Sequence, residues 1–226
     1  MIIAIDGTAG SGKTTTAKDV AKRLGFLHLD SGALYRAYAL AGCRRGWMNA
    51  SGRFDEGRIA DLARQRVTAE VQAGRVLVRL DGEALDEELR TPQVSACASQ
   101  VSAFAEIRQR VDALLRRLAS EHAGGVVCEG RDMGTVVFPE ADLKVFMAAD
   151  PEERARRRVL QRGEAVTREG VESEKQRLVA RDTADSERDV APLRAAADAL
   201  FIDTTHLTFD QQVECIVEAA RRLDTG

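Results

Sequence analysis

The sequence lacks paired cysteines, a long apolar run and an excess of positive charge, and each absence narrows the possible functions. Its four cysteines in 226 residues have no metal-site spacing, which indicates free thiols in a reducing compartment. The net charge of −3 argues against a general nucleic-acid binder. No apolar stretch reaches transmembrane length, and the N-terminus has no secretory leader pattern. We therefore expect a cytoplasmic protein without nucleic-acid or membrane partners.

The most informative motif lies at the start of the chain. Residues 7–14 read GTAGSGKT and fit the pattern G-x-x-x-x-G-K-[ST], after a short apolar strand and before a helical sequence. The glycines let successive backbone N–H groups turn inward as an anion-binding nest, beside the positive end of a helix dipole. The motif predicts that Lys13 reaches the β- and γ-phosphates of a nucleoside triphosphate and that Thr14 ligates Mg²⁺. A glycine-rich turn that binds no ligand is the alternative.

Short apolar runs alternate with helical patterns along the chain. This alternation predicts an α/β fold, a doubly wound parallel sheet of about five strands flanked by helices. Ligands of such folds lie beyond the carboxyl ends of the strands. The predicted strands are 2–5, 27–29, 126–128, 143–147 and 199–202, and the predicted helices are 14–24, 101–122, 151–162, 171–182 and 209–223.

One segment departs from this rhythm. Residues 67–71 and 76–80 alternate apolar and polar side chains around a turn, which predicts a small antiparallel β insertion. We expect it to belong to a substrate-binding subdomain over about 37–98. Farther along, an arginine-rich stretch at 154–162 and a polar stretch at 163–170 indicate a short helical lid that moves.

A P-loop alone does not distinguish a kinase from an ATPase or a GTPase. The guanine-binding pattern N-K-x-D is absent, which weakens the GTPase interpretation. Transfer between two phosphorylated molecules brings together more negative charge than one Mg²⁺ and one lysine neutralise. Arginine supplies fixed charge and bidentate geometry for phosphate, and the basic residues of this chain are nearly all arginines. Codon bias explains that preference on the surface, but not where particular arginines lie.

Two groups of charged residues have the spacing of a shared helix face. The first group is Arg154, Arg157, Arg158 and Arg162, and the second is Arg181, Asp185 and Arg188. The alternative to phosphate binding is a solvated helix face for the first group. For the second group it is an Arg181–Asp185 surface ion pair worth about 0.3–0.5 kcal/mol.

Five segments carry a resemblance to the bacterial cytidylate kinase family. They read DSGALYR at 30–36, ASQV at 98–101, EGRDMGTVVFP at 129–139, RD at 181–182 and VAPL at 190–193. Their order and spacing match that family over almost the whole chain, and the third segment is highly specific. The resemblance implies ATP-dependent phosphorylation of CMP and dCMP to the diphosphates by direct in-line transfer, with UMP a poor acceptor.

The same resemblance implies a domain organisation. A single kinase unit over 1–226 would have its core at 1–36, 99–150 and 190–226, a monophosphate-binding insertion at 37–98 and a lid at 151–189. Its partners would be the nucleotides ATP, CMP and dCMP, with Mg²⁺ as the metal. The resemblance also implies a monomer.

For the donor, the resemblance places ATP on the P-loop and under the arginines of the lid. Thr14 would bind Mg²⁺. Glu129, at a strand end, either takes part in the metal site, directly or through a water molecule, or is a solvated or salt-bridged carboxylate. The residues implied to bind ATP are Gly7, Gly10, Ser11, Gly12, Lys13, Thr14, Thr15, Arg154, Arg157 and Arg158.

For the acceptor, the resemblance implies contacts to the base, the sugar and the phosphate of CMP. Ser31, Tyr35 and Arg36 would line the site, with Ser99, Arg108 and Asp132 at the cytosine edge, Arg36, Arg131 and Arg188 on the phosphate, and Arg181 and Asp185 at the sugar. The catalytic residues would be Lys13, Arg131, Asp132, Arg158, Arg181 and Arg188, among which Asp132 is the candidate if the reaction uses a general base.

The sequence departs from the family pattern at two positions. Thr8 stands where the family usually has proline, and we expect little effect there. Glu129 stands where many relatives have aspartate, so its carboxylate is one methylene farther from the backbone and its contact is open. The residues alone leave two other functions open. One is a kinase for another monophosphate or a small hydroxylated metabolite, and the other is a P-loop module that uses nucleotide as a switch.

Overall fold

A computed structural model describes residues 1–49 and 52–224 of the chain. Its internal contacts divide it into two compact units, the first formed by Met1–Phe26 with Gly124–Gly226 and the second by Leu27–Ala123. Within the described residues, no helix is long and apolar enough to cross a membrane. The division into a core, an insertion at 37–98 and a lid at 151–189 stays a prediction.

The first unit is built on parallel strands, as the apolar runs predict. β1 (Ile2–Gly7) pairs with β6 (Val126–Glu129) and with β7 (Leu143–Ala148), and β7 pairs with β8 (Leu200–Asp203). With β2 (Leu27–Asp30), the five-stranded sheet has the order β2-β6-β1-β7-β8. Every residue of β1 from Ile3 to Gly7 is buried, so both faces of this central strand are covered, which suits its continuous apolar sequence. The predicted α/β fold is confirmed.

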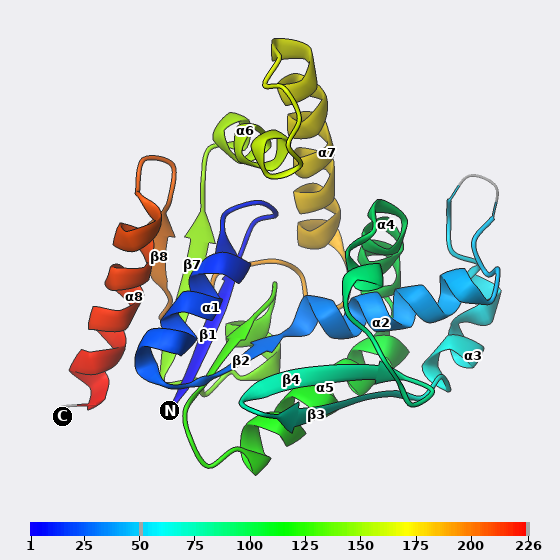
Figure 1. Cartoon of the computed structure of the whole chain (residues 1–226), viewed down its shortest axis with the longest axis horizontal. Helices are drawn as coiled ribbons and strands as arrows, with labels where there is room; N and C mark the ends of the chain where they lie inside the picture. Colours follow the sequence, from blue (N-terminus) through cyan, green and yellow to red (C-terminus); the bar gives the residue numbers. More distant parts are fainter. Residues whose placement is uncertain (50–51, 225–226) are drawn as a thin grey trace. The chain divides into compact units, whose positions relative to one another are not determined.

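Two pairs of helices belong to this unit (Figure 1). α1 (Lys13–Leu24) and α8 (Phe209–Asp224) pack against each other, and their apolar faces share a core cluster with β1 and β7. α6 (Pro151–Gln161) and α7 (Arg168–Glu187) form the second pair, at the top of the view. The Asp150 side chain accepts hydrogen bonds from the first turn of α6, and Thr167 caps α7 in the same way, so both helix starts are set by local sequence.

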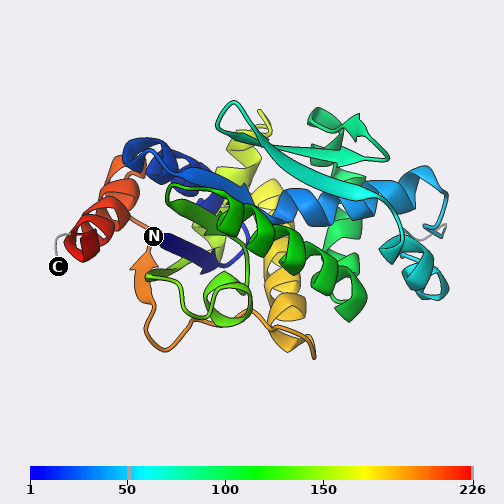
Figure 2. The same cartoon turned by 90° about the horizontal axis from the view of Figure 1, so that it is seen from below.

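The second unit combines helices with a small antiparallel sheet. β3 (Val67–Gln72) and β4 (Arg75–Leu80) form the predicted hairpin, and β5 (Glu83–Ala84) extends it. α2 (Ser31–Arg44) packs against this hairpin and against α5 (Ala105–Glu121) (Figure 2). The shorter elements are η1 (Glu56–Arg58), α3 (Ile59–Ala63), η2 (Glu87–Arg90) and α4 (Pro92–Val101).

The sequence pattern misplaces the ends of two helices and misses three others. The helix predicted at 101–122 starts too early, because Val101 ends α4 and α5 begins at Ala105. Backbone hydrogen bonds from Ala103 to Gln100 and from Phe104 to Val101 form the turn between them. The helix predicted at 171–182 is α7, which is longer at both ends. α2, α3 and α4 were not predicted, since α2 and α4 show little polar alternation and α3 has only five residues.

Candidate active site

The P-loop is fixed against the end of β7. A Cβ on Gly7 would lie 1.9 Å from the Met147 carbonyl oxygen, and the φ of +144° is one that side chains rarely adopt. Thr8 N–H donates to the same oxygen at 3.2 Å. Glycine is therefore required at position 7 for backbone packing, whether or not a phosphate is bound.

Lys13 lies inside the loop that it terminates. Its side chain is buried, and Nζ donates to the Thr8 carbonyl at 2.6 Å and to Ser11 Oγ at 3.4 Å. Burial holds the pKa of Lys13 well below its usual range, the nearby Arg131 lowers it further, and Glu129 opposes both effects. An ammonium group in this position is stabilised by added negative charge.

The remaining P-loop residues surround this ammonium group. Gly10 and Gly12 have positive φ angles, and Gly12 is the residue before the first turn of α1. The buried Ser11 accepts a hydrogen bond on its carbonyl from Thr204. Thr15 is exposed, and its hydroxyl bonds to the Gly12 carbonyl at 2.8 Å.

Thr14 and Glu129 form the one pair of oxygen ligands that the sequence predicted for a metal. Thr14 Oγ1 donates to Glu129 Oε2 at 2.9 Å, so a hydroxyl from α1 meets a carboxylate from the end of β6. Oxygen atoms of this kind suit Mg²⁺, which is usually held by one or two protein groups together with substrate phosphates and water. The donor set therefore fits the predicted metal, and the longer side chain of Glu129 reaches the Thr14 hydroxyl.

α6 and α7 hold the P-loop through the backbone of a single residue, Ala9. Arg154 is buried, donates to the Ala9 carbonyl at 2.7 Å and forms an ion pair with Asp182. Asp182 in turn accepts a hydrogen bond from Ala9 N–H at 2.8 Å. The solvated face considered for the first arginine group is therefore wrong for Arg154. Asp182 was given no role from the sequence, although a carboxylate next to Arg181 on a predicted helix was its visible signal.

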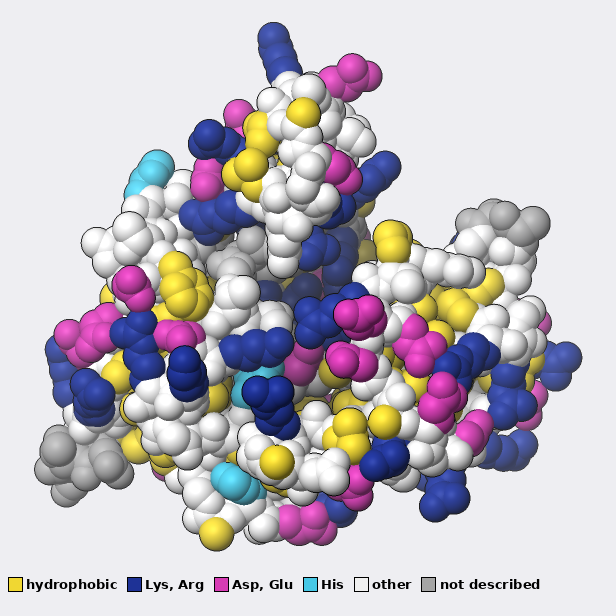
Figure 3. Space-filling view, viewed as in Figure 1, with side chains coloured by type: hydrophobic (Ala, Val, Ile, Leu, Met, Phe, Trp, Pro, Cys, Tyr) yellow, Lys and Arg dark blue, Asp and Glu magenta, His cyan; other side chains and the backbone are white. Residues whose placement is uncertain are grey.

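The other lid arginines have different surroundings. Arg158 and Arg162 both approach Glu174 of α7, at 3.9 and 3.0 Å, so these residues do face the partner helix. Arg157 points elsewhere, with Nη2 donating to the carbonyls of Thr204 at 2.8 Å and Thr205 at 3.1 Å. Figure 3 shows basic and acidic side chains mixed over this helix pair at the top of the view.

Two arginines and two buried carboxylates form a second cluster in the first unit. Asp185 accepts from Arg131 Nε at 2.9 Å and lies 4.0 Å from Arg188. Arg188 Nη2 lies 3.6 Å from Asp132, while its Nε donates to the Ala191 carbonyl at 2.6 Å. These contacts orient both guanidinium groups before any ligand binds. The alternative of a surface ion pair between Arg181 and Asp185 is wrong, because Asp185 is buried and its carboxylate faces Arg131 and Arg188.

The structure adds Asp6, to which the sequence gave no role. Its two carboxylate oxygens accept the N–H groups of Met133 and Gly134 at 2.8 and 2.7 Å. Burial raises the pKa of Asp6 to about 6, and the neighbouring charge of Asp132 adds to the increase. Asp6 thus ties β1 to the π-helical turn at Met133–Val137, which follows Asp132. Its signal was a carboxylate at the end of an apolar strand.

The second unit brings together four of its five predicted acceptor residues on two helices. Arg108 of α5 is buried with its guanidinium 5.6 Å from the centre of the Tyr35 ring, a cation–π arrangement, and it donates to the Ser102 carbonyl at 3.1 Å. Arg36 pairs with Asp30 at 2.8 Å. Ser31 is buried at the start of α2, and Ser99 lies on α4.

A family comparison adds to this geometry. The family model described as cytidylate kinase matches residues 3–222. The chain belongs to the cytidylate kinase family. A cytidylate kinase of Desulfitobacterium hafniense is 43% identical, covering 99% of this chain and 94% of the relative. One of Chlorobaculum tepidum is 40% identical over 99% of this chain and 94% of the relative. The chain is therefore a kinase of the nucleoside monophosphate class, which confirms the resemblance.

A structural comparison agrees with the fold of a cytidylate kinase family member. The crystal structure of an uncharacterized protein from Eubacterium ventriosum superposes with a TM-score of 0.54, covering 98% of both chains at 13% identity. At that identity the likeness supports the fold alone. The roles of individual residues rest on the geometry of the two units.

Proposed function

We propose that this chain transfers the γ-phosphoryl group of ATP to the phosphate of CMP or dCMP, giving ADP and the corresponding diphosphate. One observation carries the proposal. Arg131, from the loop after β6, lies close enough to lower the pKa of Lys13 in the P-loop. Two cations held near each other are stabilised when phosphate groups lie between them. Phosphoryl transfer between two phosphates needs one cation on the phosphate donor and one on the phosphate acceptor, close to each other.

The donor side uses the P-loop. Its backbone N–H groups and Lys13 would hold the terminal phosphates of ATP, and the Thr14 hydroxyl with Glu129 would hold Mg²⁺, which neutralises phosphate charge when bound. Thr14 and Glu129 already lie 2.9 Å apart, which supports this assignment. Arg154 holds the P-loop backbone, so we assign it to positioning. Of the lid arginines predicted to bind ATP, we assign Arg157 and Arg158 to ATP itself.

We assign residues to the acceptor separately for each unit. In the first unit, Arg131 and Arg188 would bind the CMP phosphate, with Arg181 and Asp185 at the sugar and Asp132 at the base. Their ion pairs with buried carboxylates support a fixed orientation. In the second unit, we assign Ser31, Tyr35, Arg36, Ser99 and Arg108 to CMP. The Asp30 carboxylate paired with Arg36 must yield or share that guanidinium when a phosphate binds.

The chemistry needs positioning and charge more than proton transfer. A phosphate oxygen of CMP attacks the γ-phosphorus while the bond to the β-phosphate oxygen of ATP breaks. The acceptor is already an anion at neutral pH, so no general base is required. Lys13, Arg131, Arg158, Arg181 and Arg188 would stabilise the charge on the transferred group.

A coupled assay of ADP release tests the proposal. The protein is supplied with Mg-ATP and, in turn, CMP, dCMP, UMP, AMP, a small hydroxylated metabolite such as shikimate, or no acceptor. We expect fast release with CMP and dCMP, slow release with UMP and almost none without an acceptor. Release only with UMP or with the hydroxylated metabolite, or equal release without any acceptor, would contradict the proposal and favour the alternative kinase or the nucleotide switch.

Three finer statements belong to the same proposal. We infer a monomer that acts in the cytoplasm on nucleotides rather than nucleic acids, supported by the negative net charge and by free cysteines without metal-site spacing. Light scattering after size-exclusion chromatography tests the monomer. A mass twice that of the 24.6 kDa chain would contradict it.

A further inference from the structure

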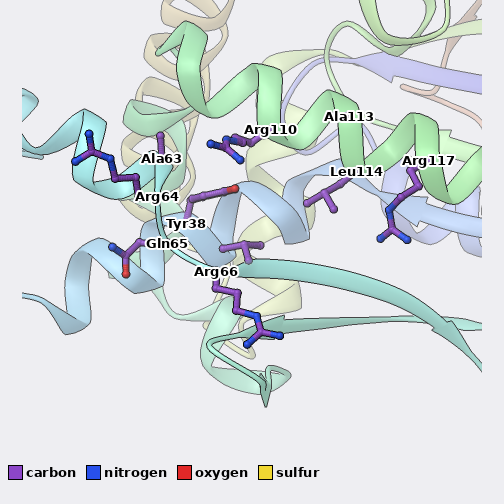
Figure 4. A pocket seen from close by; sticks show the side chains of 10 residues that line it. Tyr38, Ala63, Arg64, Gln65, Arg66, Arg110, Ala113, Leu114 and Arg117 are labelled. Atoms are coloured by element: carbon purple, nitrogen blue, oxygen red, sulfur yellow. The ribbon is translucent and has the colours of Figure 1, made fainter.

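A pocket in the second unit takes no part in the proposed reaction. Its volume is about 510 Å³, within the range of small-molecule sites. It lies where α2, the segment from α3 into β3, and α5 meet (Figure 4). None of the predicted CMP residues lines it. The lining residues are Tyr38, Ala63, Arg64, Gln65, Arg66, Val67, Arg110, Ala113, Leu114 and Arg117.

The pocket is strongly basic in a protein of negative net charge. Four of its ten lining residues are arginines. Arg64 and Arg117 have carboxylate neighbours, Asp61 at 3.5 Å and Glu121 at 2.9 Å. Among residues 1–49 and 52–224, the side chains of Arg66 and Arg110 have no carboxylate partner. Positive charge that the chain itself leaves unpaired in a concave site attracts an anion.

One wall of the pocket is a regular face of α5. Arg110, Ala113, Leu114 and Arg117 follow one another at helical spacing, so α5 presents a stripe with a cation at each end and apolar side chains between them. Arg117 is held in place by its hydrogen bond to the Ala69 carbonyl at 2.7 Å. Figure 4 shows Arg110 on α5 above the Tyr38 ring on α2.

Tyr38 supplies a hydroxyl to the same space. Its side chain is only 2% exposed and lines the pocket, and its hydroxyl forms no hydrogen bond with any described residue. The hydroxyl oxygen is not among the fully buried atoms, so it is open to a hydrogen bond with a ligand oxygen. Together with the arginines, it offers hydrogen bonds and charge beside the apolar surface of Val67 and Leu114.

We infer that this pocket is a second anion-binding site, which takes a small ligand with two or more phosphate charges beside a flat heteroaromatic ring. That is the chemistry of a nucleoside diphosphate or triphosphate. The phosphates bind Arg66 and Arg110, and the ring lies on the apolar wall. Inorganic polyphosphate shares the charge but not the ring.

The site communicates with CMP binding through two helices. Tyr38 lies one turn after Tyr35 on α2, and Arg110 lies two residues after Arg108 on α5. A ligand that draws Arg110 and Tyr38 together changes the spacing of the helices that hold Arg108 over Tyr35. This consequence rests on the proposed function, because it assigns Tyr35 and Arg108 to CMP.

Isothermal titration with CTP and with tripolyphosphate tests the inference on the whole chain. Both also bind the P-loop, so the readout is the number of sites at low ionic strength. The pocket variant is Arg66→Ser with Arg110→Ser. The matched control is Arg75→Ser with Arg90→Ser, which removes the same charge from exposed positions outside the pocket. Ala113→Glu places a carboxylate in the pocket without removing a cation.

We expect two sites in the parent and the control. In the pocket variant and in Ala113→Glu, the second site should weaken by 10-fold or more. CTP binding more tightly than tripolyphosphate supports a nucleotide, and equal binding supports the phosphates alone. A single site in the parent, or equal weakening in the control, would overturn the inference. Binding is measured without CMP, so the number of sites can be interpreted even if the kinase assay contradicts the proposed function. In the same way, the kinase assay can be interpreted even if the second site is not found.

Discussion

The arginine cluster of the first unit and two arginines in the pocket of the second unit have opposite surroundings. In the first unit, Arg131, Arg154 and Arg188 are each held by a carboxylate and by backbone carbonyls, and they lie largely out of solvent. In the pocket of the second unit, Arg66 and Arg110 are exposed and have no carboxylate partner. Paired cations have a fixed geometry, as catalysis requires. Unpaired cations provide attraction without strict geometry, as reversible binding requires.

The largest expected effect concerns the buried cation of the P-loop. Lys13→Met should lower turnover with CMP at least 10²-fold, because it removes charge stabilisation from the transferred phosphoryl group. The free energy of unfolding of the unliganded protein should not fall, since burial and Arg131 already disfavour the ammonium. ADP release and urea denaturation measure the two quantities. A marked loss of stability would show that Lys13 is structural rather than poised for phosphate.

The next effect tests the paired cluster. Asp185→Ala leaves Arg131 without its carboxylate, and it should lower the free energy of unfolding by about 3 kcal/mol. If Asp185 binds the ribose, the KM for CMP should rise more than the KM for dCMP. Asp189→Ala, which removes an exposed carboxylate nearby, is the control. Equal KM changes for the two acceptors would remove Asp185 from the sugar site.

A third prediction concerns pH. The pKa of Asp6 is about 6 in the folded chain and 3.8 as the ordinary value, so its ionised form costs stability in the fold. That cost is fully present above pH 6 and disappears as the pH falls toward 3.8. Relative to Asp6→Asn, the parent should therefore gain about 2 kcal/mol of unfolding free energy between pH 7 and pH 4. Denaturant titrations of both proteins measure it, and a difference independent of pH would contradict the assignment.

The smallest expected effect concerns the unpaired arginines in the pocket of the second unit. Arg66→Ser with Arg110→Ser should change the free energy of unfolding by less than about 0.5 kcal/mol, because exposed, unpaired arginines contribute little to folding. Thermal unfolding measures it. A loss as large as that of Asp185→Ala would mean that the pocket arginines are structural, and the contrast between the two units would disappear.

Local features were predictable from the sequence, and features made by distant segments were not. The loop at residues 7–14 and the strand and helix beside it depend on residues that are adjacent in the sequence, so their positions were predicted almost to the residue. The cluster around Asp185 was visible only as a helical spacing, since its partner Arg131 comes from another segment. The second pocket joins residues 38, 63–67 and 110–117, which no local pattern connects.

The bonds around Ala9 have a mechanical consequence. Arg154 of α6 donates to the carbonyl of Ala9, and Asp182 of α7 accepts from the N–H of the same residue, so the two successive peptide groups of the loop are both held. The helix pair therefore cannot lift or swing without either breaking this tether or pulling the loop along with it. While this tether holds, the P-loop and the two helices move together, and we therefore expect displacement of α6 and α7 to accompany the release of a nucleotide bound by the loop.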